Sequence, residues 1–222
     1  MRCAILLSGL LPLLLGGCGE ATKPTGAGSG NANFKYETQG DAVTITGFDS
    51  WVSGVLSIPA TVEGKSVTSI GSEAFSWCQQ LTSIAVPDSV TSIGKGAFSW
   101  CSSLRSVTIP DSVTSIGEDA FNGCESLSGI TIPDSITSIG DNAFALCTSL
   151  TSVTIGDSVT SIGENPFIGC ENLTAVTFLG DAPKLDNSVF VIENPTIYRK
   201  PEAKGWGETF AGRPVKLISE KP

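Results

Sequence analysis

Cysteine is the residue type in this chain whose spacing most suggests chemistry. Cys78, Cys101, Cys124, Cys147 and Cys170 stand 23 residues apart. Neighbouring strands lie about 4.8 Å apart, within reach of a disulfide, so a ladder of bridges is one interpretation. The number of cysteines is odd, however, and all of them have the same direction within their repeat. We therefore expect a row of buried thiols that pack as small hydrophobic side chains. A linear row also does not converge on a zinc ion.

Four aspartates follow the same interval, at Asp88, Asp111, Asp134 and Asp157. A row of carboxylates could hold calcium along one edge of a solenoid. Calcium needs several oxygens around one point, however, and each repeat supplies only one. The alternative that we favour is an Asx turn, in which each side chain accepts a hydrogen bond from a backbone N–H after a strand. We predict no metal site and no cofactor.

The chain contains no histidine. This absence removes the commonest general base and the commonest metal ligand, and it excludes Ser–His and Cys–His nucleophiles. Gly64-Lys65-Ser66 is similar to the end of a phosphate-binding loop, but the glycine that this motif needs five residues before Gly64 is Pro59. The sequence therefore predicts no catalytic residue and a protein that is not an enzyme.

The overall charge limits the choice of partner. The formal net charge is −9 over 222 residues. Such a field repels nucleic acid and anionic membrane surfaces, so we expect no nucleic-acid partner.

The rows of cysteine and aspartate must be positioned by a repeat of 23 residues. Residues 104–126 read LRSVTIPDSVTSIGEDAFNGCES, and residues 127–149 read LSGITIPDSITSIGDNAFALCTS. A self-similar period of this length predicts a solenoid, in which each unit rests on its neighbours. Leu104, Val107 and Ile109 have the spacing of an inward-facing strand that ends at Pro110, which lacks an N–H group.

The second half of each unit returns the chain to the next strand. Val113 and Ile116 point inward again, and Gly117 is expected to permit a reversal of the backbone. Residues 118–124 are expected to form one or two helical turns that bury Ala120, Phe121 and Cys124.

The unit resembles the BspA-like leucine-rich repeats of bacterial surface proteins, whose signature is SVTSIG followed by AF, GC and a leucine. This resemblance covers residues 33–222. It implies a repeat solenoid of short parallel β-strands, stacked one per repeat, with short helical or 3-10 turns and a cap at each end. It also implies attachment to host or matrix proteins, or between cells.

The predicted organisation starts with a bacterial lipoprotein signal peptide. Residues 1–17 contain Arg2 and an apolar run too short to span a bilayer, and they end in Leu-Gly-Gly before Cys18. This end resembles a lipobox, which implies lipidation of Cys18. Gly19 follows rather than Asp, which implies an outer-membrane or cell-surface location. The remaining predicted parts are a flexible tether at 18–32, an N-terminal cap at 33–66, leucine-rich repeats at 67–180 and a C-terminal cap at 181–222.

Two outward rows of side chains are candidates for contact with a partner. Thr108, Thr131 and Thr154 lie on the strand face, although threonine also simply favours exposed strand positions. The residue before the cysteine is glycine in two units but Trp77, Trp100 and Leu146 in the others. We expect the two tryptophans to stack near Leu146, either to bind a glycan or a protein or to cover the junction with the N-terminal cap.

The sequence as a whole predicts a non-catalytic, lipid-anchored surface module that recognises a protein or glycan and touches the membrane only through the lipid on Cys18. The alternative is a structural subunit of the cell envelope that assembles with copies of itself.

Overall fold

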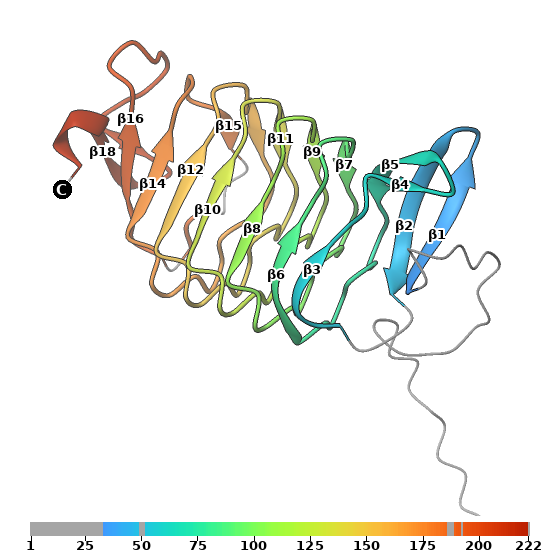
Figure 1. Cartoon of the computed structure of the whole chain (residues 1–222). Coiled ribbons are helices and arrows are strands. Elements are labelled where there is room, and N and C mark those ends of the chain that lie inside the picture. Colours follow the sequence, from blue (N-terminus) through green and yellow to red (C-terminus); the bar gives the residue numbers. More distant parts are fainter. Residues whose placement is uncertain (1–32, 49–51, 186–188, 192, 222) are drawn as a thin grey trace, which may run out of the picture.

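The computed structural model describes residues 33–48, 52–185, 189–191 and 193–221. These residues wind into a stack of turns, with β1 at one end and β18 at the other (Figure 1). Successive turns lie side by side in the order of the sequence, which is the arrangement predicted for a repeat solenoid.

The leading part of each repeat forms the longer strands, which define what we call the long-strand face. These strands are parallel, but they divide into two sheets. The first sheet contains β3 (Ser53–Ser57), β6 (Gln80–Ala85) and β8 (Ser106–Thr108). The second contains β10 (Gly129–Ile132), β12 (Ser152–Ile155), β14 (Ala175–Phe178), β16 (Thr196–Arg199) and β18 (Arg213–Leu217), with β17 (Thr209–Phe210) antiparallel at its edge.

A second set of strands, not expected from the sequence, runs along another face. Each Ser-Ile pair adds a two-residue strand, because Ser92 pairs with Ser115 and Ile93 with Ile116 in register. The sheet starts with β1 (Phe34–Gln39) and β2 (Ala42–Phe48). It continues through β5 (Lys65–Ile70), β7 (Ser92–Ile93), β9 (Ser115–Ile116), β11 (Ser138–Ile139), β13 (Ser161–Ile162) and β15 (Lys184–Leu185), with β4 (Thr61–Val62) beside β5. The expectation of one strand per repeat is therefore wrong for most units.

The predicted helical turns at residues 118–124 are also wrong, and hydrogen bonding explains why. Ala120 donates its N–H to Gly117 O, as in a tight turn, but the neighbouring residue Phe121 donates to Ala143 O in the next repeat. Every second N–H of this segment thus donates to a carbonyl of the following turn instead of one within the segment. A continuous helix cannot form when half of its donors are used between turns.

The core contains one row of residues for each inward position. The phenylalanine rings form a continuous stack, with centroid distances from 5.3 to 5.9 Å, in the order Phe75, Phe98, Phe121, Phe144, Phe167 and Phe190. Phe75 to Phe167 are fully buried. Because each ring packs on the ring of the next repeat, burial is shared between turns rather than completed within one.

Gly117 serves a different purpose from the one expected. Its φ is not among the positive values, so it does not reverse the chain. A Cβ at this position would instead lie 2.7 Å from Lys95 N and 2.8 Å from Gly94 C, both in the preceding turn. Gly140 meets the backbone of Glu118 and Gly117 in the same way. The glycine row is therefore needed for close approach between turns.

The two ends differ in structure. At the start, β1 and β2 form an antiparallel hairpin in which Val43 and Ile45 are buried. At the other end, a 3-10 helix (η1, Ile218–Glu220) follows β18. Trp206 packs there on Phe178 and Phe210, with centroids 5.0 and 4.6 Å away.

Candidate binding surfaces

The three threonines predicted to contact a partner lie together on the long-strand face. Thr108, Thr131 and Thr154 belong to β8, β10 and β12, and all three line one groove of about 490 Å³. Hydroxyl, apolar and carboxylate side chains share the rest of the lining: Val107, Ile109, Asp111, Gly129, Ile130, Pro133 and Ser152. The volume is within the range of small-ligand sites in proteins.

The groove follows an interruption in the hydrogen bonding between two repeats. β8 and β10 are neighbours in the stack but belong to different sheets. Arg105 donates its N–H to Thr82 O, and Thr151 donates to Ser128 O, each at 3.0 Å. Among the described residues, no corresponding bond joins Ser128 to Arg105. The strand ladder is thus open at this level.

The same interruption continues beyond the strands. Thr114 donates its N–H to Thr91 O, and Thr160 donates to Thr137 O, each at 2.9 Å. In the part of the chain that the structure describes, Thr137 makes no such bond to Thr114. We call the boundary between repeats 104–126 and 127–149 the open seam. Peptide N–H and C=O groups at the open seam lack the hydrogen bonds that join the corresponding groups at the neighbouring boundaries, so they can bond to a ligand.

The open seam is confined to one side of the solenoid. Ile116 still pairs with Ile139, and the rings of Phe121 and Phe144 stack at 5.4 Å. On the long-strand face, Gly129 occupies the row of Ser106 and Ser152, and its missing side chain deepens the groove. The repeats therefore stay joined through the core while their surface edges separate.

The tryptophan row lies elsewhere on the surface. The rings of Trp77 and Trp100 stack at 5.1 Å with an interplanar angle of 9°, as predicted, and Trp77 is 40% exposed. Leu146 does not join this pair. Its Cδ2 lies 2.7 Å from where a Cβ of Gly169 would be, so its side chain leans over the following turn. Gly123 separates Leu146 from Trp100 in the row, and the nearness of Leu146 to the pair stays a prediction.

The backbone at these positions is strained. Trp77, Trp100 and Leu146 have φ of 62°, 59° and 56°, in the left-handed region that Gly123 and Gly169 also occupy. The left-handed conformation costs a side-chain-bearing residue roughly 1–2 kcal/mol. Glycine adopts this conformation without strain, yet three large residues occupy it. This strain is a reason to look for a function of their side chains.

The cysteine row is buried, as predicted. Cys101, Cys124, Cys147 and Cys170 are free, and each thiol donates a hydrogen bond of 3.1–3.3 Å to the carbonyl of a phenylalanine in the preceding repeat. Cys78 lies in the same row and is buried as well.

Burial makes these thiols poor nucleophiles. It raises the pKa of Cys101 from the ordinary 9.0 to about 12. It also raises the pKa of Cys124 and of Cys147 well above 9.0. Because the thiolate is the reactive form, the cysteine row contributes packing rather than chemistry.

One member of the aspartate row links neighbouring turns. Asp134 Oδ1 accepts a hydrogen bond of 2.8 Å from the N–H of Asp157 in the next repeat. Outside the row, Asp141 accepts one from the N–H of Glu164. The predicted Asx turn within one repeat is therefore wrong for Asp134. Among the described residues, no group of three His, Cys, Asp or Glu side chains is placed to hold a metal ion.

Glu193 is a buried polar residue that sequence reasoning missed. It stands 23 residues after Cys170 and is 5% exposed. Its Oε1 accepts a hydrogen bond of 2.6 Å from Gly169 N–H. The counterpart of Gly169 in the preceding turn is Leu146, whose N–H donates to a backbone carbonyl, Ile168 O. Counting the period beyond Cys170 would have identified Glu193 as the residue that closes the cysteine row.

Cys18, the predicted lipidation site, lies outside the described residues. Within the described part of the chain, no helix has the length and apolar character needed to cross a membrane.

Comparisons with known proteins agree with this geometry. A family model described as the BspA type leucine-rich repeat region matches residues 68–194, more than half of the chain, in six copies. The crystal structure of a leucine-rich repeat protein from T. pallidum is similar, with a TM-score of 0.63, 33% identity and coverage of 70% of this chain and 71% of that one. A search of curated proteins gives no match.

Two further solved structures share the fold. A leucine-rich cell surface protein from Faecalibacterium prausnitzii has a TM-score of 0.57 at 31% identity, with 82% of this chain and 47% of that chain covered. The pneumococcal vaccine antigen PcpA has a TM-score of 0.60 at 18% identity, with 79% and 44% covered, and shows the fold alone. The repeats, their stacking and the family match lead to one conclusion: this chain belongs to the family of BspA-type leucine-rich repeat proteins.

Proposed function

We propose that this protein is a non-catalytic surface module that binds a protein or glycan partner along the groove at the open seam. The observation that carries the proposal is the coincidence of two features at one place. The threonine row of Thr108, Thr131 and Thr154 lies where the ladder between β8 and β10 is interrupted. A leucine-rich repeat solenoid is a binding scaffold, and the similar F. prausnitzii protein is described as a cell surface protein.

The chemistry of the groove favours an extended, hydrogen-bonding ligand. Its hydroxyl groups and open peptide edges offer donors and acceptors, while Val107 and Ile130 add apolar contact. An extended peptide or a glycan chain can satisfy both kinds of contact, because main-chain or hydroxyl groups bond to the edges. No step of catalysis is needed for this role.

The test is a matched pair of substitutions in one row of the long-strand face. Thr131→Lys places a long side chain in the groove, whereas Ala85→Lys adds the same charge at an exposed position outside it. Both variants are screened by surface plasmon resonance against matrix proteins and glycan arrays. We expect Thr131→Lys alone to lower ligand capture at least tenfold. Equal capture by both variants and the parent protein would exclude the groove.

A second candidate surface for the same function is the Trp77–Trp100 pair. Its strained backbone and the exposure of Trp77 favour it. Joint substitution of both tryptophans by glycine keeps the left-handed backbone accessible. If capture then falls while Thr131→Lys has no effect, the partner binds the tryptophan pair instead.

We further propose that Cys18 carries a lipid that anchors the protein at the outer membrane or cell surface. The support is the Leu-Gly-Gly-Cys end of the leader. Cys18→Ala should abolish metabolic labelling with a palmitate analogue and move the protein to the soluble fraction. Labelling that persists in this variant would contradict the anchor.

The alternative role is assembly with copies of the same chain. Analytical ultracentrifugation over a wide range of concentrations distinguishes the two roles. A monomer that captures a separate ligand supports the binding module, and concentration-dependent association without capture supports the structural subunit.

A further inference from the structure

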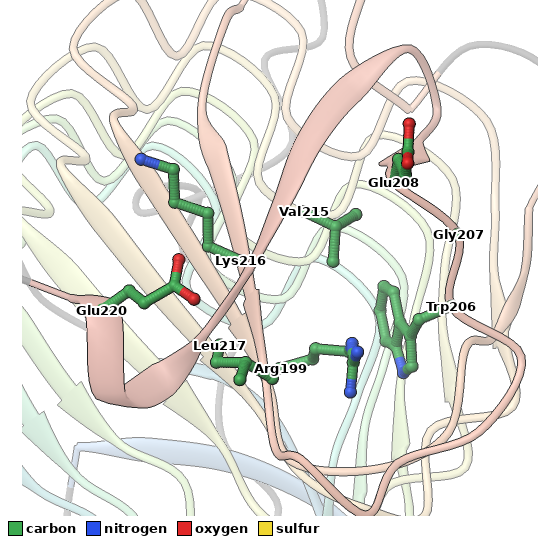
Figure 2. A pocket seen from close by; sticks show the side chains of 8 residues that line it. All are labelled: Arg199, Trp206, Gly207, Glu208, Val215, Lys216, Leu217 and Glu220. Carbon is green, nitrogen blue, oxygen red and sulfur yellow. The ribbon is translucent and has the colours of Figure 1, made fainter.

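A second pocket, far along the stack from the open seam, lies in the C-terminal part of the molecule. It encloses about 450 Å³ and is built from β16, β18, η1 and residues 206–208. Figure 2 shows the Arg199 side chain reaching toward the indole of Trp206, with Val215 beside them and Lys216 and Glu220 on the other side of the pocket.

The guanidinium of Arg199 is fixed but only partly used. Its Nη1 donates to Lys200 O at 3.0 Å and to Pro201 O at 3.1 Å, which sets the direction of the group. Its Nε is buried and has no hydrogen-bond partner in the structure. Nη2 makes no hydrogen bond to any described residue. The buried Nε is out of a ligand's reach, so Nη2 is the donor that this guanidinium can offer to a carboxylate, in a charge-assisted hydrogen bond.

Trp206 supplies a rigid aromatic wall opposite this charge. Its Nε1 donates to Gly180 O at 3.2 Å, and its ring packs on Phe178 and Phe210. The indole therefore cannot swing away, and a ligand ring that packs on it meets a surface already in place. An aromatic wall with a polar rim is a common recognition device for a ring that is apolar on one face.

The charge around the pocket contrasts with that of the chain. Residues 196–222 contain six Lys or Arg and three Asp or Glu, whereas the whole chain carries −9. A local excess of positive charge in an acidic protein attracts anions to this end. The carboxylates of Glu208 and Glu220 at the rim can still accept hydrogen bonds from hydroxyl groups.

We propose that this pocket binds a uronic acid residue of an acidic glycan. The sugar carboxylate accepts a hydrogen bond from Nη2 of Arg199, a carbon face of the ring packs on Trp206, and sugar hydroxyls donate to Glu208. A sugar suits these groups better than a simple anion, because the pocket combines a cation, an aromatic wall and acceptors. The site is separate from the groove and does not depend on the function proposed there.

The test is isothermal titration calorimetry of the full chain in detergent with tetragalacturonate, and with uncharged maltotetraose as the matched neutral sugar. We expect tetragalacturonate to bind at least tenfold more tightly, since one hydrogen bond to a charged group is worth about a factor of ten or more. No heat with tetragalacturonate, or equal affinity for maltotetraose, would overturn the proposal. Tighter binding of free glutamate than of tetragalacturonate would exclude a sugar as the ligand.

Two pairs of variants connect the binding to this pocket. Arg199→Lys keeps the charge but loses the fixed Nη2 donor of the guanidinium, and it should weaken tetragalacturonate binding about tenfold. Glu208→Ala should weaken it severalfold, because it removes an acceptor for sugar hydroxyls, whereas Glu202→Ala, an exposed position outside the pocket that loses the same charge, should leave it within twofold. This second pair decides the matter if Arg199→Lys does not fold. Equal effects at Glu208 and Glu202 would show a response to overall charge alone and contradict the site. Thr131→Lys should leave tetragalacturonate binding unchanged.

Discussion

The indole of Trp100 covers Gly123 in the next turn, so that a Cβ built on the glycine would lie 2.7 Å from Cε3 of the ring. Leu146 and Gly169 stand in the same relationship. Trp77 differs, because the residue one repeat later is Trp100, whose ring stacks on that of Trp77. The glycines at positions 123 and 169 therefore have a packing origin within the chain, whatever the exposed part of the row binds.

This relationship predicts that Gly123→Ala and Trp100→Ala are coupled. Gly123→Ala alone should lower the free energy of unfolding by about 2–4 kcal/mol, because it combines a clash with left-handed strain. In the presence of Trp100→Ala, the clash is removed and only the strain of about 1–2 kcal/mol should remain. Urea denaturation of the two single variants and the double variant measures the coupling. Strict additivity would contradict the contact.

The glycine row between turns gives a second prediction. Gly117→Ala should destabilise the protein by about 1–3 kcal/mol, because the new methyl group meets backbone atoms that cannot rotate away. Gly129→Ala is the control. Its Cβ would lie 3.6 Å from Ser152 and its φ is not positive, so its effect should stay within about 0.5 kcal/mol. Thermal unfolding compares them, and similar melting temperatures for both variants would refute the close-approach argument.

The thiols predict a characteristic dependence on pH. Burial raises the pKa of Cys101 to about 12, whereas the ordinary value of 9.0 applies to the unfolded chain. Below pH 9 the thiol is protonated in both states and contributes its full stability. Above pH 9 only the unfolded chain loses the proton, so stability falls as pH rises from 9 toward 12. Urea midpoints across this range measure the effect, and Cys101→Ala should flatten the slope.

The same burial predicts protection from alkylation. At pH 8, iodoacetamide should label Cys101, Cys124, Cys147 and Cys170 only after unfolding, with all four modified together, because the stacked turns unfold as a unit. Mass spectrometry of the native and urea-treated protein checks this. Rapid labelling of one of these residues in the native state would show local opening at that repeat.

Glu193 predicts a difference between two substitutions. Glu193→Ala removes the acceptor for Gly169 N–H and should cost about 1–3 kcal/mol, since the donor is left without its partner in a half-buried site. Glu193→Gln keeps an oxygen acceptor of similar shape and should cost less than half as much. Chemical denaturation separates them. An equal loss in both variants would mean that the charge of Glu193, rather than the hydrogen bond, stabilises this end.

Much of the architecture followed from the repeat period of the sequence. Identical spacing of Leu104, Val107, Ile109 and Phe121 with their counterparts predicts stacked turns with inward rows, because each unit is too small to bury its own core. The stacking of Trp77 on Trp100 followed from the same period. The burial of the cysteines did as well, since their side chains point inward at the same position of every turn.

The tertiary structure decided what depends on contacts between turns. The helical turns expected at residues 118–124 are absent because their N–H groups bond to the next repeat, which no property of one unit reveals. Gly117 and Asp134 likewise act across the boundary between turns. The open seam appears between two repeats that share 14 of their 23 residues, and the Arg199 pocket forms where the period has ended. The sequence by itself determined the period and the inward rows. The stacking of the turns decided how their backbones bond to one another, because those bonds join residues that are 22 or more positions apart.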